Sequence, residues 1–162
     1  GRHRGEQGPD GDDYLSGGAG DDRIFGEGGD DKLFGGAGND HLHADAGNDR
    51  INGGAGNDFI EGGRGDDILN GEEGNDWLEG GAGDDLFVFD IGGSFDKVQD
   101  FAAGAGSEDV LDLTAFTAFS EIGDLYITNF AGETTIVFGG GDGVQLLGVG
   151  ASDLHEDDFM FA

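Results

Sequence analysis

The chain contains no cysteine, a single proline and only seven Lys and Arg residues, against 36 Asp and Glu residues among its 162 positions. The lack of cysteine excludes a disulfide framework, a thiolate metal site and a cysteine nucleophile. A formal net charge of −29 excludes nucleic acid and anionic membranes as electrostatic partners. No apolar run approaches the roughly 20 residues of a membrane-spanning helix, so no membrane span is predicted.

The composition also opposes folding. Like charges repel, and the 37 glycines lose much conformational freedom when they become ordered. A chain of this kind needs a cation in order to fold, because a small extracellular domain without disulfides is usually stabilised by a bound metal. Its first residues, GRHRGEQG, include neither a starting Met nor the apolar stretch of a signal peptide. A fragment of a longer chain is therefore expected.

Residues 8–88 repeat one nine-residue unit nine times without an insertion. The units are GPDGDDYLS, GGAGDDRIF, GEGGDDKLF, GGAGNDHLH, ADAGNDRIN, GGAGNDFIE, GGRGDDILN, GEEGNDWLE and GGAGDDLFV. The fourth position is always Gly, and the eighth is always a large apolar residue, from Leu15 to Phe87. The sixth position is always Asp: Asp13, Asp22, Asp31, Asp40, Asp49, Asp58, Asp67, Asp76 and Asp85. Such a fixed period predicts a repeat architecture in which each unit packs on its neighbours.

Each unit reads as a turn followed by a very short strand. In Gly53–Glu61 the first six residues favour a turn, and Phe59, Ile60 and Glu61 favour a strand whose middle side chain points inward. Two units then form one eighteen-residue coil of a flattened parallel β-helix. The turns stack in two columns: the first column contains Asp13, Asp31, Asp49, Asp67 and Asp85, and the second contains Asp22, Asp40, Asp58 and Asp76.

Stacked carboxylates need a cation between them, because buried unpaired charges are costly. Calcium suits the site, since it accepts six to eight oxygens from carboxylates and backbone carbonyls. We expect each Asp to bridge two ions while carbonyls of positions one to four complete the shells, which gives about seven interior sites. The candidate carbonyl ligands are those of Gly17, Ala19, Gly26, Gly28, Gly35, Ala37, Ala44, Ala46, Gly53, Ala55, Gly62 and Arg64.

The repeat resembles the GGxGxDxUx nonapeptide of the RTX (repeats-in-toxin) family of calcium-binding proteins. The resemblance implies an all-β fold, a right-handed parallel β-roll followed by a β-rich C-terminal cap. It also implies a secreted, extracellular protein that uses the type I secretion apparatus. The acidic and apolar C-terminus, Asp157–Ala162, is similar to the uncleaved signal of such substrates.

The period ends after Phe89, and strands are expected at 97–101, 110–113, 125–130, 134–138 and 144–149. The predicted organisation is a leader at residues 1–7, the β-roll at 8–88 and the cap at 89–162. Asp100, with Asp96, Asp109 and Asp112, could hold one more calcium or form solvated strand edges. Both readings stay open.

The chain has no HExxH, GxSxG or P-loop pattern, so no catalytic residue and no enzyme activity is predicted. The leading hypothesis is a monomeric module that is unfolded at low calcium and folds on extracellular calcium. One alternative is a carbohydrate- or surface-binding module, like the repeats attached to alginate epimerases or adhesins, with outward Phe59 and Trp77 contacting the ligand or packing on the cap. Another is the non-catalytic tail of a secreted metalloprotease or lipase.

Overall fold

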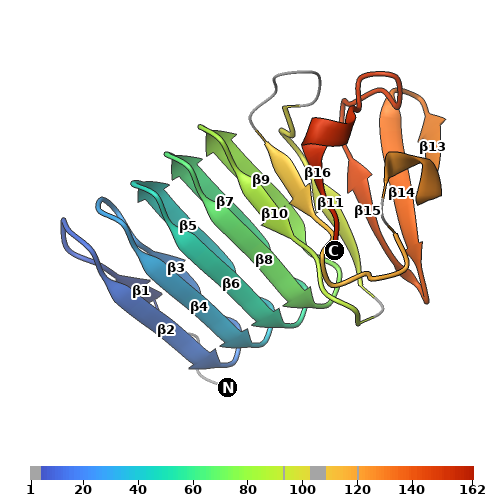
Figure 1. The fold of residues 1–162 in the computed structure, drawn as a ribbon. Helices are drawn as coiled ribbons and strands as arrows, with labels where there is room; N and C mark the ends of the chain where they lie inside the picture. The colour runs from blue at the N-terminus through green and yellow to red at the C-terminus, as the bar shows by residue number, and fades with distance from the viewer. Residues whose placement is uncertain (1–4, 93, 103–108, 120) are drawn as a thin grey trace.

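The computed structural model describes residues 5–92, 94–102, 109–119 and 121–162. Their strands form two long sheets that face each other across a flattened solenoid (Figure 1). The first sheet has the order β1 (Gly5–Gln7), β3 (Arg23–Phe25), β5 (His41–Ala46), β7 (Phe59–Arg64), β9 (Trp77–Ala82), β11 (Phe95–Val98), β15 (Asp142–Leu146), β14 (Glu133–Gly139) and β13 (Tyr126–Phe130). The second has the order β16 (Phe159–Met160), β12 (Val110–Asp112), β10 (Leu86–Val88), β8 (Ile68–Glu73), β6 (Arg50–Ala55), β4 (Lys32–Ala37) and β2 (Tyr14–Ala19).

Strands of successive coils pair in parallel at an offset of eighteen residues. Phe59 lies beside Trp77, and Ile60 lies beside Leu78, in the β7–β9 pair. The predicted parallel β-roll is therefore confirmed. The strands are longer than expected, because they continue through the first three positions of the next unit, as β7 does to Arg64. The turn is correspondingly shorter and occupies positions four to six.

The core is a thin layer built from the eighth position of each unit. From Ile24 to Phe87 these side chains are at most 1% exposed, whereas Leu15, in the first unit, is only partly buried. Small residues at the first position also face inward, as Ala44 does. Alternation between a large and a small inward residue keeps the two sheets close together at the turns, where the Asp side chains lie.

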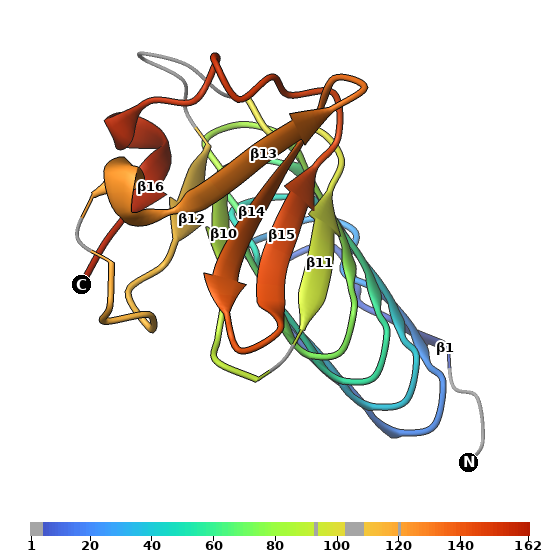
Figure 2. The same cartoon turned by 90° about the vertical axis from the view of Figure 1, so that its right-hand side faces the viewer.

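The segment after the repeats continues both sheets before it closes them (Figure 2). β11 pairs with β9, and β12 pairs with β10, both in parallel. β15, β14 and β13 then add an antiparallel extension to the first sheet. All five strands expected after the repeats are present, with shifted bounds. Short 3-10 helices at Ile122–Asp124 and Glu156–Asp158 complete the cap.

Aromatic side chains cover the end of the core beneath the cap. The Phe116 and Phe138 ring centroids lie 4.8 Å apart. Phe89 packs against Phe138 at 5.8 Å, and Phe87 packs against Phe101 at 6.0 Å. These contacts join the last repeat to the C-terminal segment in one continuous hydrophobic core.

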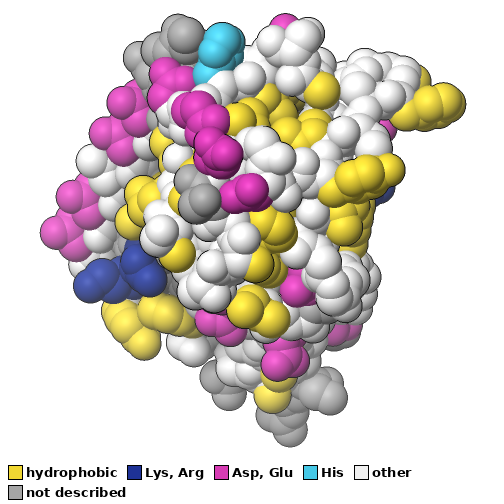
Figure 3. All heavy atoms as spheres, turned by 45° about the vertical axis from the view of Figure 1, so that its right-hand side comes forward, with side chains coloured by type: hydrophobic (Ala, Val, Ile, Leu, Met, Phe, Trp, Pro, Cys, Tyr) yellow, Lys and Arg dark blue, Asp and Glu magenta, His cyan; other side chains and the backbone are white. Residues whose placement is uncertain are grey.

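The outer surface of the molecule differs between the roll and the cap. Figure 3 shows many acidic side chains along one side of the visible face, while hydrophobic side chains are scattered among backbone and other side chains over the rest. Tyr126 and Phe130 of β13 are 69% and 86% exposed. The described residues contain no helix of the length and apolar character needed to cross a membrane.

Candidate metal site

The sixth-position Asp residues are connected within each column by backbone hydrogen bonds. The N–H of each Asp donates to Oδ1 of the Asp eighteen residues later, as Asp31 does to Asp49 and Asp40 to Asp58. These bonds are 2.7–3.0 Å long throughout both columns. The predicted columns are therefore present, and one carboxylate oxygen of each later Asp is used to fix the register between coils.

The other oxygen, Oδ2, is buried and accepts no hydrogen bond within the described part of the chain at eight positions: Asp13, Asp31, Asp40, Asp49, Asp58, Asp67, Asp76 and Asp85. From Asp31 onward these residues are at most 3% exposed. Leaving a buried polar atom without a hydrogen-bond partner lowers the stability of the fold by roughly 1–3 kcal/mol in mutational measurements, and a charged oxygen costs more. Each column therefore contains a row of oxygens that require a cation.

Backbone carbonyls approach the same places. A Cβ added to Gly17 would lie 2.7 Å from Oδ2 of Asp22 and 2.9 Å from the carbonyl oxygen of Gly35, one coil later. The same arrangement recurs at Gly26, where Oδ2 of Asp31 and the carbonyl oxygen of Ala44 converge. We call the space between successive turns of one column an inter-turn gap. The first position is Gly in eight of the nine units and Ala44 in the other, so no side chain larger than a methyl group enters the gap from this position.

The first-position carbonyls that face a gap in this way include Gly26, Gly35, Ala44 and Gly53 from the predicted set, and also Gly71 and Gly80. The third-position carbonyls behave differently. Those of Ala37, Ala46, Ala55 and Arg64 accept the N–H of the fourth-position Gly one coil earlier, at 2.7–2.9 Å, and the carbonyl of Gly28 does so for Gly11. Ala19 lies in the first coil of the roll, and no fourth-position Gly precedes it by one coil in the described part of the chain. The role of either carbonyl set as calcium ligands stays a prediction.

The electrostatics of the columns favour neutralisation. Burial raises the pKa of Asp58 and Asp67 to about 7, and that of Asp49 and Asp85 to about 6, above the usual 3.8. Donated N–H groups lower these values, and neighbouring carboxylates raise them again. Burial therefore disfavours the bare carboxylate at Asp49, Asp58, Asp67 and Asp85, and a proton or a cation relieves this cost. A hard divalent cation can serve two carboxylates at once, so the arrangement fits calcium.

Among the described residues, no three Asp, Glu or His side chains converge as a metal cluster. The geometry explains this result, because each gap contains carboxylates from only two turns and the remaining oxygens are backbone carbonyls. His43 is used elsewhere: its Nε2 lies 2.7 Å from Oε2 of Glu61 on the outer face.

A second ladder at the fifth position was missed by the sequence reasoning. This position is Asp or Asn in all nine units. Here the N–H donates backward, from Asn57 to Oδ1 of Asn39 and from Asn75 to Oδ1 of Asn57, both at 2.8 Å. The equivalent bonds of the other coils are 2.9–3.1 Å long. The sequence contained a signal for this ladder, because the fifth position is restricted to Asp and Asn, whose Oδ1 can reach the backbone N–H of the neighbouring coil.

The family model described as "RTX calcium-binding nonapeptide repeat (4 copies)" matches residues 8–42, 34–69 and 61–95, which together cover more than half of the chain. The chain belongs to the RTX calcium-binding repeat family. The RTX repeat region is thus a calcium-binding module, and nothing in the family match indicates catalysis. No curated protein matches this RTX chain.

The fold of the RTX chain is similar to that of one solved extracellular lipase. The extracellular lipase LipA of Serratia marcescens is 18% identical over 96% of this chain and 39% of its own, with a TM-score of 0.50. This RTX chain therefore spans well under half of the lipase. Two subunits of the Azotobacter vinelandii mannuronan C5-epimerase also match. AlgE6R2 is 25% identical over 97% of this chain and 92% of its own, with a TM-score of 0.44. AlgE6R3 is 26% identical over 96% of this chain and 81% of its own, with a TM-score of 0.38.

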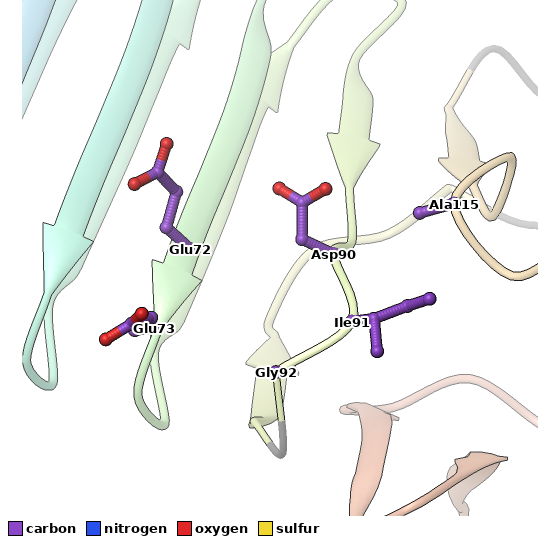
Figure 4. A pocket seen from close by; sticks show the side chains of 6 residues that line it. All are labelled: Glu72, Glu73, Asp90, Ile91, Gly92 and Ala115. Atoms are coloured by element: carbon purple, nitrogen blue, oxygen red, sulfur yellow. The ribbon is translucent and has the colours of Figure 1, made fainter.

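A hollow of about 440 Å³ lies on the outside of the RTX roll, lined by Glu72, Glu73, Asp90, Ile91, Gly92 and Ala115 (Figure 4). Two of its carboxylates already accept amide hydrogens. Glu72 accepts from Asn52, and Asp90 accepts from Asn70 at 2.9 Å. Because these carboxylates have partners on the outer face, the hollow is not part of the calcium columns.

The outward row at Phe59 and Trp77 is only partly covered. His41 stacks on Phe59 with centroids 5.7 Å apart, and Nζ of Lys97 lies 5.9 Å from the Trp77 ring centroid. Lys97 belongs to β11, which extends the same sheet. The cap therefore contacts Trp77 through Lys97 of β11, the next strand of the same sheet.

Proposed function

We propose that this RTX chain is a calcium-driven folding module of a larger secreted protein. In calcium-poor cytoplasm the acidic repeats would remain unfolded, which suits passage through the type I secretion apparatus. Outside the cell, calcium would bind only the folded form and shift the equilibrium toward it by mass action. The observation that carries the proposal is the pair of columns with buried, partnerless Oδ2 atoms.

In this proposal about seven calcium ions occupy the gaps within the repeats, the five sixth-position Asp residues inside the columns each bridge two ions, and the four at the column ends each bind one ion within the repeats. Residues 8–88 form the calcium-binding roll, residues 89–162 form the cap that templates it, and the last residues act as the secretion signal. The chain functions as a monomer and is itself not an enzyme. It supports the stability of whatever upstream domain it accompanies, such as a lipase or a metalloprotease.

Far-UV circular dichroism during calcium titration, with magnesium as the control, tests this proposal. We expect a coil-to-β transition with calcium alone, because magnesium requires a tighter octahedron than these turns provide. A steep transition would indicate coupling between turns. A β-rich spectrum that persists in a chelator would contradict the folding switch.

A second candidate function is recognition of a glycan or surface through the outward row. It is favoured by one observation, the adjacent aromatic and basic side chains His41, Phe59, Trp77 and Lys97 on one sheet face. Loss of glycan retention on an affinity gel by Trp77→Ala, with an unchanged calcium titration, would support it. Equal retention of the variant and the parent would refute it.

A further inference from the structure

Both Asp columns continue beyond the last repeat. In the second column the N–H of Asp76 donates to Oδ1 of Asp96 at 3.0 Å, and in the first column the N–H of Asp85 donates to Oδ1 of Asp109 at 3.0 Å. These are the same contacts that connect the repeat Asp residues to one another. The chain separations are 20 and 24 residues in place of eighteen. The cap therefore supplies one additional carboxylate to each column from outside the repeats.

Each junction also contains an oxygen that requires a partner. Asp76 and Asp85 are 2% and 1% exposed, and their Oδ2 atoms accept no hydrogen bond in the described part of the chain. Asp96 and Asp109 are each 4% exposed. Within the described residues, no Lys or Arg forms an ion pair with any of these four carboxylates. Lys97 follows Asp96 in sequence but is exposed over the Trp77 ring.

The other two acidic residues of this segment have different surroundings. Both oxygens of Asp100 accept backbone hydrogens, from Gly80 at 3.0 Å and from Gly81 at 2.7 Å. Asp112 lies on the outer side of β12 and accepts the N–H of Thr114 at 2.9 Å. Neither carboxylate contacts the N–H of a sixth-position Asp. Asp100 therefore binds backbone groups at the first two positions of the last repeat, and Asp112 binds the backbone two residues later. Of the four, Asp96 and Asp109 alone accept the N–H of a sixth-position Asp, so only they occupy column positions.

Asp109 also shows where its column ends. Its Oδ2 accepts the N–H of Ala102 at 2.8 Å, whereas the Oδ2 atoms of the repeat Asp residues in the same column, Asp31 to Asp85, remain without a partner. Its Oδ1 still faces the turn of Asp85. The gap before Asp109 thus has the carboxylates of an interior gap, and the far side of Asp109 is closed by protein.

We propose that one further calcium ion binds in each junction gap, between Asp76 and Asp96 and between Asp85 and Asp109. This inference rests on the proposed function, because it extends the same columns. The first column then contains five occupied gaps and the second contains four. The two junction ions connect the roll to the cap, so the C-terminal segment and the last coil fold together.

Native mass spectrometry of the whole chain at saturating calcium measures the stoichiometry directly. Nine bound ions are expected, and seven would overturn the inference even if the chain folds with calcium. If the chain binds no calcium, the proposed function itself fails. The stoichiometry therefore separates the two outcomes without any variant.

Four substitutions then locate the ions. Asp96→Asn and Asp109→Asn are each expected to lose one calcium, because Asn keeps the Oδ1 that accepts from Asp76 or Asp85 but lacks the charge. Asp109→Asn also loses the bond from Ala102 to Oδ2, just as Asp100→Asn loses one of its two backbone bonds. Asp100→Asn and Asp112→Asn are the matched controls, and they are expected to retain the full number. Circular dichroism at saturating calcium checks that each variant is folded. An unchanged count in Asp96→Asn, or an equal loss in Asp100→Asn, would overturn the assignment.

Discussion

Replacing Ile51 by Ala should shift the calcium midpoint of folding only slightly. Ile51 is 1% exposed and lies in register with Leu33 and Leu69 of the neighbouring coils. Truncation of such a side chain costs about 3 kcal/mol, within the range for buried Ile→Ala changes. Each bound ion changes the folding free energy by about 1.4 kcal/mol per decade of calcium. The nine ions proposed for the whole chain then give roughly 13 kcal/mol per decade, so the midpoint moves by less than about twofold.

Asp49→Ala should behave differently, although it is also a single substitution. Asp49 takes part in two gaps, since it accepts from Asp31 and its N–H donates to Asp67. Loss of two ions lowers the steepness of the transition from about nine to about seven ions, as well as raising the midpoint. Ile51→Ala should leave the steepness unchanged.

The assay is a calcium titration at fixed free-calcium levels, read by circular dichroism and by the fluorescence of Trp77, the single tryptophan. Isothermal titration calorimetry of both variants counts the ions independently. If Ile51→Ala reduced the steepness as much as Asp49→Ala, folding and binding would not be linked as reasoned. Asp49→Ala with one lost ion would disprove the bridging role.

Three further outcomes are expected. Because burial raises the folded-state pKa of Asp58 and Asp67 to about 7 from 3.8, the metal-free fold should be most stable below about pH 4 and should lose that stability as the pH rises through about 7. Protons compete with calcium for these carboxylates, so the calcium midpoint of folding should rise as the pH falls from about 7.5 to about 5.5. A pH-independent midpoint would contradict this. Asn57→Ala should cost about 1 kcal/mol by removing an acceptor from the fifth-position ladder, and Asn57→Asp, which keeps that oxygen, should cost measurably less in the same titration. Gly54→Ala should need more calcium to fold than Gly18→Ala, since both have positive φ but only at Gly54 would a Cβ meet a backbone carbonyl, and equal midpoints would refute that steric argument.

Much of the roll could be predicted because two signals in each unit coincide. An inward apolar residue and a fixed Asp, two positions apart, define both the coil and its columns. The strand length could not be predicted in the same way. Residues 62–64, Gly-Gly-Arg, favour a turn when read locally, yet they extend β7 because β9 presents a parallel partner one coil later. Pairing between coils overrides the local preference.

The junction carboxylates were harder to assign, because the eighteen-residue spacing is broken there. Asp96 and Asp109 each keep the last part of the repeat pattern, with an apolar residue two positions later at Val98 and Leu111. From the sequence alone, Asp96 and Asp109 could not be distinguished from Asp100 as candidate calcium ligands. Only the hydrogen bonds show that Asp100 contacts backbone groups of Gly80 and Gly81 instead.

The stacking of coils also determines how the molecule responds to force. Each coil contacts the next through one strand pair per sheet and through the two side-chain ladders. Tension along the chain would therefore peel the roll one coil at a time, and each eighteen-residue coil would release about 60 Å of extended chain. Every step would also free the calcium ions held between that coil and its neighbour. The resistance of the roll to pulling is thus expected to increase with the calcium concentration around it.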